Sequence, residues 1–97
     1  MFRLDNKIAL VTGSSRGIGR GIALALAKAG ADIVVNYAGN AKAAEETADL
    51  IREMGRKALV IQADVGEEEQ VDIMFKKIKS EFGRLDILVN NAGTSQD

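Results

Sequence analysis

Four short apolar runs alternate with longer amphipathic stretches along this chain. The runs at 7–12, 32–37, 57–63 and 85–91 are rich in β-branched residues and mostly unbroken. Such runs are typical of strands that are buried on both faces of a parallel sheet. We therefore expect four parallel strands.

The stretches between these runs place apolar residues at helical spacing, which predicts three helices. The expected buried faces consist of Ile18, Ile22, Leu26 and Ala29 in the first helix, Ala44, Ala48, Ile51 and Met54 in the second, and Val71, Met74, Phe75, Ile78 and Phe82 in the third. Asn40 is a suitable N-cap for the second helix. Gly30, Gly55 and Gly83 each follow a helical run, where a residue of positive φ is favoured.

The predicted elements follow the order β-α-β-α-β-α-β with short connections. Right-handed crossovers between consecutive strands then produce a parallel sheet with helices on its faces, an α/β fold. The sequence contains no repeat, proline-rich linker or low-complexity tract that would mark a domain boundary. We expect residues 1–97 to belong to one domain.

Composition restricts the chemistry. The formal net charge is −1 and no basic stripe is present, so we expect neither a nucleic-acid nor a membrane partner. The chain contains no Cys and no His, which excludes a Cys/His zinc site and a Ser–His–Asp triad within it. With no signal-peptide pattern and no cysteine, we expect a cytoplasmic location.

The stretch TGSSRGIG at 12–19 lies between the first predicted strand and the first predicted helix. A glycine-rich turn that leads into a helix directs free N–H groups at the loop and so forms an anion site. We expect Gly13 to permit the tight turn, Gly17 to let a phosphate approach the backbone, and Gly19 to allow close helix packing. Ser14 and Ser15 add hydroxyl groups. The alternative is a turn with a purely structural role.

The choice of nucleotide is expected to depend on the end of the second strand. Asn36 and Tyr37 stand there and carry no charge, whereas Asp32 opens the strand at its other end. Arg16, inside the glycine-rich loop, supplies a cation that reaches a 2′-phosphate. This pattern favours NADP over NAD, the alternative being that Arg16 is a solvated loop residue.

Taken together, TGSSRGIG at 12–19, DV at 64–65 and NNAG at 90–93 resemble the amino-terminal half of the short-chain dehydrogenase/reductase family. The resemblance runs through all 97 residues. It implies a Rossmann-type sheet with strand order 3-2-1-4 and helices on both faces, a truncated half of the full domain. Residues 1–97 would then be the amino-terminal part of a single dinucleotide-binding domain.

Within the family, the chain is most similar to the 3-oxoacyl-[acyl-carrier-protein] reductases of fatty acid biosynthesis, and glucose 1-dehydrogenases read similarly. The resemblance implies that loop 13–19 holds the pyrophosphate, with Ile18 near the nicotinamide. It implies further contacts to adenine from Asp64 and the Val65 backbone, and to the adenosine ribose from Asn91, Ala92 and Gly93. Alternatively, Asp64 caps the third helix and Gly93 only lets the backbone pass close by. Asn90 is expected to tie the central strands together.

No catalytic residue is carried over to this chain. The family's catalytic Ser, Asn and Tyr-x3-Lys pair lie beyond the part of the pattern that these residues match. Tyr37 is the only tyrosine, and Ala41 occupies the position four residues later where a lysine would be needed. The resemblance implies an NADP(H)-dependent oxidoreductase that reduces a carbonyl, such as a 3-oxoacyl thioester, to a hydroxyl. This chain would carry only the cofactor-binding half of that enzyme. Alternatives are a stand-alone nucleotide-binding or engineered Rossmann fragment without catalysis, and a sugar dehydrogenase.

The last predicted strand, LDILVNN, forms an exposed apolar edge in this arrangement. Such an edge pairs readily with another chain. We expect the 97-residue chain to self-associate or to pair with a chain that completes the sheet, and the parent protein to be a homotetramer that binds a dinucleotide and a small carbonyl or acyl-thioester substrate.

Overall fold

The computed structural model describes residues 3–92. It confirms the predicted alternation of strands and helices. The elements are β1 (Ile8–Val11), α1 (Gly17–Lys28), β2 (Asp32–Tyr37), α2 (Ala41–Glu53), β3 (Ala58–Gln62), α3 (Glu68–Phe82) and β4 (Ile87–Val89).

All four strands are parallel and follow the order β3-β2-β1-β4, as the resemblance implied. In the centre of the sheet, Leu10 of β1 pairs with Val34 on one side and Leu88 on the other. Strand β4 is shorter than the predicted 85–91. Its ladder ends at Val89 because the N–H of Asn91 turns to the side chain of Thr12 instead.

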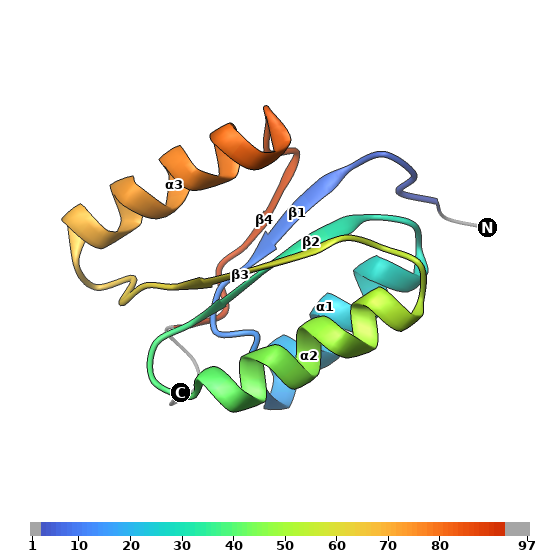
Figure 1. Ribbon diagram of the computed structural model, residues 1–97, viewed down its shortest axis with the longest axis horizontal. Helices are drawn as coiled ribbons and strands as arrows, with labels where there is room; N and C mark the ends of the chain where they lie inside the picture. Colours follow the sequence, from blue (N-terminus) through green and yellow to red (C-terminus); the bar gives the residue numbers. More distant parts are fainter. Residues whose placement is uncertain (1–2, 93–97) are drawn as a thin grey trace.

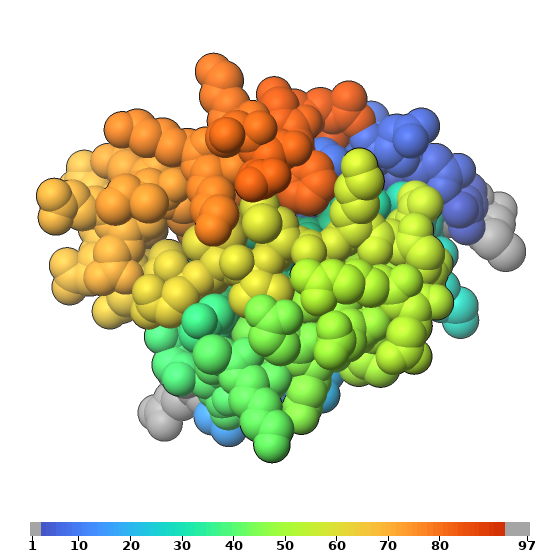
Figure 2. Space-filling view, in the orientation of Figure 1, coloured from blue at the N-terminus to red at the C-terminus, as the bar shows by residue number. Residues whose placement is uncertain are grey.

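Helices cover both faces of the sheet, which confirms the predicted layers (Figure 1). Helices α1 and α2 pack on one face, over Ala9, Val11, Ile33 and Val35. Within residues 3–92, α3 is the one helix on the other face, where Met74 and Ile78 pack with Ile8, Leu10, Val34 and Ile61. Figure 2 shows β3, in yellow, between α2 in green and α3 in orange.

The predicted buried face of α1 was wrong by one position. Gly19, Ala23 and Ala27 are the buried residues, whereas Ile18 is 68% exposed and Ile22 and Leu26 are only partly buried. The helix runs so close to the loop after β1 that only small side chains fit beneath it. The larger apolar residues therefore lie at its flanks.

The other two helices depart from the prediction at single residues. Met54, expected in the core beneath α2, is 44% exposed, and Phe75 of α3 is 37% exposed. One helix covers the α3 face, so the flank beside β4 stays open and Leu88 is 55% exposed. A pocket of about 200 Å³ lies there, lined by Leu10, Thr12, Val65, Val71, Met74, Phe75, Leu88 and Asn90.

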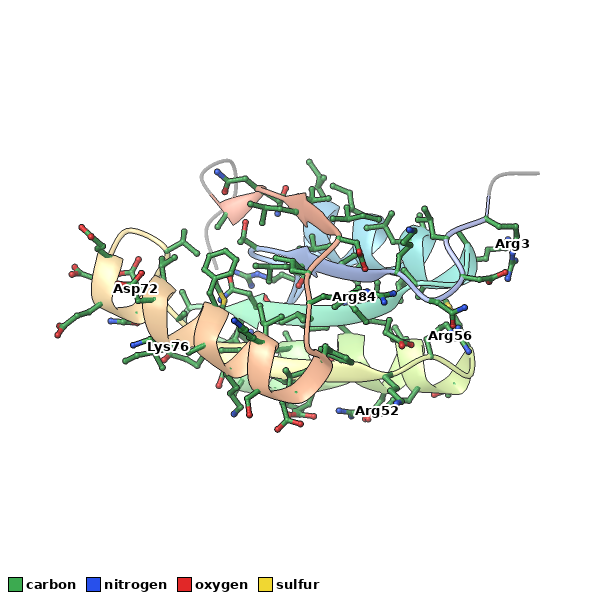
Figure 3. All side chains as sticks on the ribbon, turned by 90° about the horizontal axis from the view of Figure 1, so that it is seen from above. Arg3, Arg52, Arg56, Asp72, Lys76 and Arg84 are labelled. Carbon is green, nitrogen blue, oxygen red and sulfur yellow. The ribbon has the colours of Figure 1, made fainter. Side chains whose placement is uncertain are left out.

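The helix ends agree with the predicted caps. The side chain of Asn40 accepts a hydrogen bond from the N–H of Ala43 at 3.0 Å, and Gly30, Gly55 and Gly83 all have positive φ. Beside Gly30, Arg56 donates to its carbonyl at 2.9 Å. Arg56 and Arg3 lie together at the end of the molecule where the strands begin (Figure 3).

Candidate functional site

The glycine-rich loop lies where β1 ends, in the middle of the sheet. Chain connections leave β1 toward β2 on one side, while β4 arrives on the other. Open α/β sheets bind ligands at such a switch point, outside the carboxyl ends of the strands. The loop 13–19, Asn36, Asp64 and Asn91 all lie at this edge, since each follows or ends a strand.

Two glycines of the loop adopt a left-handed conformation. Gly13 has φ 61° and Gly17 has φ 62°, values that cost other residues strain. A Cβ on Gly17 would have no atom within 4 Å. Gly17 is therefore required by its backbone, and the space beside it is open.

Gly19 is required by packing instead. A Cβ there would lie 2.1 Å from the carbonyl oxygen of Gly13 and 2.7 Å from Nδ2 of Asn91. The helix, the loop and the residue after β4 thus meet at one point. The expectation that Gly19 allows close packing agrees with this geometry.

The two serines of the loop are fully buried and differ in their bonding. The hydroxyl of Ser14 donates to the carbonyl of Val11 at 2.7 Å and accepts from the N–H of Asn36 at 3.2 Å. It therefore ties the loop to β1 and β2. The hydroxyl of Ser15 has no partner in the described part of the chain. A buried hydroxyl without a partner in the loop fits a group that receives or donates a bond when ligand is bound.

Asn36 is buried, in contrast to the cofactor contact expected for it. Its Oδ1 accepts from the N–H of Gly13 at 3.1 Å, and its Nδ2 donates to the carbonyls of Ile61 and Ala63 at 3.3 and 3.2 Å. Both amide hydrogens are used. The side chain therefore holds the loop against β3 and has no donor left for a ligand.

Thr12 joins the ends of β1 and β4. Its hydroxyl accepts from the N–H groups of Asn91 and Ala92 at 2.8 and 3.0 Å. Its hydrogen has an acceptor in Oδ1 of Asn90 at 3.3 Å, which agrees with the strand-tying role expected for Asn90. The side chain of Asn91 donates to the carbonyl of Gly13 at 3.1 Å. Residues 91–92 thus lie against the loop.

The first turn of α1 leaves backbone donors available. Arg16 is the N-cap and makes no side-chain capping bond. Among residues 3–92, the N–H groups of Ile18 and Gly19 meet no acceptor. A helix start with free N–H groups and the positive end of the dipole attracts an anion. Together with the Ser15 hydroxyl and the open space at Gly17, this geometry fits a diphosphate.

Asp64 and Val65 lie at the turn between β3 and α3. One carboxylate oxygen of Asp64 accepts from the N–H of Gly66 at 2.9 Å, and its backbone N–H donates to Gln70 at 2.8 Å. Asp64 thus forms the turn before α3, whose N-cap is Glu67. Its other carboxylate oxygen has no partner among the described residues. Val65 lines the pocket beside β4.

The remaining candidates are placed as follows. Asp32 accepts from the N–H of Lys57 at 2.8 Å, at the end of β2 opposite the loop. Tyr37 packs against the core beneath α2. Gly93 lies outside the described residues.

Within residues 3–92, no three His, Cys, Asp or Glu side chains gather as metal ligands, and no helix has the length and apolarity to cross a bilayer.

Two residues at the loop were missed by the sequence reasoning. Arg20 of α1 and Thr47 of α2 both contact the carbonyl of Ser15, at 2.8 Å in each case. The sequence position of Arg20 could have indicated a contact to the loop, since the residue follows Gly19 directly. Thr47 lies 32 residues from Ser15, and nothing in its local sequence indicates the contact.

This fold and this loop define the chain as an α/β unit of the Rossmann type. The family described as short chain dehydrogenase matches residues 7–97. The chain belongs to this family, as the motifs indicated.

Known proteins of the family resemble the chain over most of its length. The 3-oxoacyl-[acyl-carrier-protein] reductase FabG of Staphylococcus aureus (strain Mu50) is 50% identical over 91 residues, which cover 94% of this chain and 37% of that protein. Versicolorin reductase stcU of Emericella nidulans is 50% identical over 92 residues, 95% of this chain and 35% of that protein. The chain thus spans little more than a third of these relatives.

Solved structures show the same arrangement. A hydroxysteroid dehydrogenase from Escherichia coli superposes with a TM-score of 0.85 at 40% identity, over 91% of this chain and 37% of that one. The reductase LugOII, described as catalysing keto-reduction at C1, gives a TM-score of 0.83 at 47% identity, over 93% of this chain and 38% of its own.

Proposed function

We propose that this chain is the amino-terminal part of the dinucleotide-binding domain of an NADP(H)-dependent oxidoreductase that reduces a carbonyl to a hydroxyl. The observation that carries the proposal is the loop 13–19. It leads into α1 with N–H groups at Ile18 and Gly19 that meet no acceptor among residues 3–92, a buried hydroxyl at Ser15, and open space beside Gly17. The cytoplasmic location expected above is part of the same proposal.

In this proposal the loop holds the pyrophosphate. The N–H groups of the first turn of α1 donate to its oxygens, and the hydroxyl of Ser15 adds another donor. Ile18, whose side chain is exposed at the mouth of the loop, packs near the nicotinamide. When bound, the dinucleotide supplies the hydride that reduces the carbonyl.

The adenosine end lies across the ends of β2, β3 and β4. The carboxylate oxygen of Asp64 that has no partner within residues 3–92 accepts from the adenine amino group, beside the Val65 backbone. Asn91 and Ala92, pinned next to the loop by Thr12, line the ribose, and Gly93 follows them.

Arg16 supports a preference for NADP over NAD. It is exposed at the start of α1, and no carboxylate stands at the end of β2, where the residues are Asn36 and Tyr37. A guanidinium forms strong, charge-assisted hydrogen bonds with a phosphate. An acidic side chain at the end of β2 would instead repel a 2′-phosphate.

The substrate class is proposed from the relatives. Two proteins at 50% identity are named as reductases, one of them for a 3-oxoacyl group on acyl carrier protein, and the similar reductase LugOII acts on a ketone. We propose a ketone substrate of the 3-oxoacyl thioester kind. The candidates are separated by assaying the complete protein for oxidation of NADPH with 3-oxoacyl thioesters and with simple ketones. Reduction of NADP in the presence of glucose is the reverse test for a sugar dehydrogenase.

Gly17→Ala tests the site directly, with Gly55→Ala as its matched control. Both glycines have positive φ and neither Cβ would meet an atom within 4 Å. Both variants therefore lose a similar stability, about 1–2 kcal/mol from backbone strain. Only Gly17→Ala places a methyl group in the proposed path of the pyrophosphate.

We expect Gly17→Ala to raise the Kd for NADPH by about tenfold or more, the cost of inserting a methyl group into a packed contact. Gly55→Ala should bind like the wild type. Isothermal titration of NADPH and NADH measures both. Equal affinity of the two variants would contradict a site at this loop, and absence of binding by the wild type would contradict the proposed function as a whole.

A further inference from the structure

The carbonyl oxygen of Ser15 receives an unusual number of hydrogen bonds. Nε and Nη2 of Arg20 lie 3.1 and 2.8 Å from it, and the hydroxyl of Thr47 lies 2.8 Å from it. Ser15 and Thr47 are fully buried. A carbonyl oxygen has two lone pairs, so these donors saturate it.

The donors are themselves fixed in place. Nε of Arg20 also lies 2.8 Å from Oγ1 of Thr47, so the threonine accepts from the arginine while it donates to Ser15. Nη2 of Arg20 bonds to the carbonyl of Ala43 at 2.9 Å and lies 3.4 Å from Glu46. Three parts of the chain therefore converge: the loop, α1 and α2.

These contacts set the direction of the peptide between Ser15 and Arg16. A trans peptide is planar, so its N–H points opposite to its carbonyl. With the carbonyl held toward α2, the N–H of Arg16 points the other way. Asn91 holds the carbonyl of Gly13 in a similar manner at 3.1 Å. Side chains thus keep both carbonyl oxygens bonded within the protein.

We propose that Arg20 and Thr47 are positioning residues for dinucleotide binding. They keep the Ser15 carbonyl turned away from the phosphates, so that the loop presents donors to an anion. The inference rests on the proposed function, because the pyrophosphate is the group whose binding it explains. Without the two contacts, the peptide between Ser15 and Arg16 is free to rotate and to bring a carbonyl oxygen against the phosphate oxygens, which it repels.

Thr47→Val and Thr47→Ser form the test pair. Valine preserves the shape of the buried side chain and removes the hydroxyl, whereas serine preserves the hydroxyl. We expect Thr47→Val to raise the Kd for NADPH about tenfold, the size of one buried hydrogen bond, and Thr47→Ser to restore wild-type affinity. For adenosine 2′-monophosphate, which has no 5′-phosphate to contact the loop, the affinity should fall at most about twofold.

Arg20→Gln supplies a second variant. Because the two side chains bond to the same oxygen and to each other, we expect the double variant to bind little more weakly than the weaker single one. Losses that multiply would mean that Arg20 and Thr47 act separately. Equal losses for NADPH and adenosine 2′-monophosphate would mean a general structural effect. Either result overturns the proposal.

Hydrogen exchange in the ligand-free protein judges the inference independently of cofactor. Thr47→Val should accelerate exchange of the backbone amides of residues 14–17, while amides of β2 stay protected as in the wild type. Unchanged exchange in the loop would overturn the proposal even if binding changed. If the wild type bound no dinucleotide, the proposed function would fail, and faster loop exchange would still show that Thr47 holds the loop, without the role proposed for it.

Discussion

Gly19→Ala should destabilise the protein, whereas Gly21→Ala in the same helix should not. Its Cβ would lie 2.1 Å from the carbonyl oxygen of Gly13 and 2.9 Å from its carbonyl carbon. Ordinary contacts between carbon and oxygen lie at about 3.3 Å or more. The loop must therefore move by about 1 Å, and both atoms belong to backbone that has no rotamer to change.

The cost has two parts. Overpacking of this kind costs about 1–3 kcal/mol. Displacement of the Gly13 carbonyl also breaks its bond from Asn91, now at 3.1 Å, which adds about 1 kcal/mol. Alanine regains about 1 kcal/mol through its helix propensity. We expect a net loss of about 1–3 kcal/mol from these terms, or roughly 4–24 °C in Tm for a domain of this size.

Gly21→Ala is the matched control, since it lies two residues further along the same helix with no atom within 4 Å of its Cβ. It should gain about 0.5–1 kcal/mol from propensity alone. Urea unfolding followed by circular dichroism measures both variants. If Gly19→Ala were as stable as Gly21→Ala, the close contact of α1 with the loop would be refuted.

Two further predictions concern charge. Arg16→Ala should weaken NADPH binding about 10- to 100-fold, the value of a charge-assisted bond, and leave NADH binding unchanged, with Arg52→Ala on α2 as control; an equal loss for both nucleotides would contradict 2′-phosphate recognition. The N–H of Ile8 and the guanidinium of Arg84 hold the pKa of Asp86 below its usual value. The ionised carboxylate of Asp86 therefore stabilises the fold above about pH 4, and this contribution is lost as pH falls through the lowered pKa. Asp86→Asn should therefore be less stable than the wild type at pH 7 by urea unfolding, and the difference should shrink toward pH 2; a constant difference would show that charge is not involved.

The sheet was predictable from the sequence because buried parallel strands leave a strong local signal. The runs around Leu10 and Val34 are apolar on both faces, and glycines follow each helical run. The buried face of α1 was not predictable from periodicity. Ile18 and Gly19 are neighbours, so a one-position shift fits the same spacing, and only the proximity of the Gly13 carbonyl decides which of them is buried.

The position of the site was predictable, but the direction of individual side chains was not. Asn36 stands where the residue that selects the nucleotide is expected. Successive residues of a strand point to opposite faces, and Val34 belongs to the core beneath α3. Asn36 points to that same face, toward the carbonyls at the end of β3. The number of residues after the glycine-rich loop predicts the position of Asn36 at the end of β2. The alternation of side chains along the strand determines that it bonds to β3.

The glycine-rich motif does not determine its own conformation. Its backbone is bonded by Asn36 from β2, Thr47 from α2 and Asn91 after β4, which lie 23, 32 and 78 residues from their partners in the loop. Glycines make a loop permissive, and such a loop needs outside contacts to hold one shape. A peptide that carried only the first strand, the loop and α1 would contain the whole motif and none of these three contacts. The proposed anion site is therefore a property of the assembled sheet with α2, and loss of α2 or β4 should abolish anion binding while the motif remains intact.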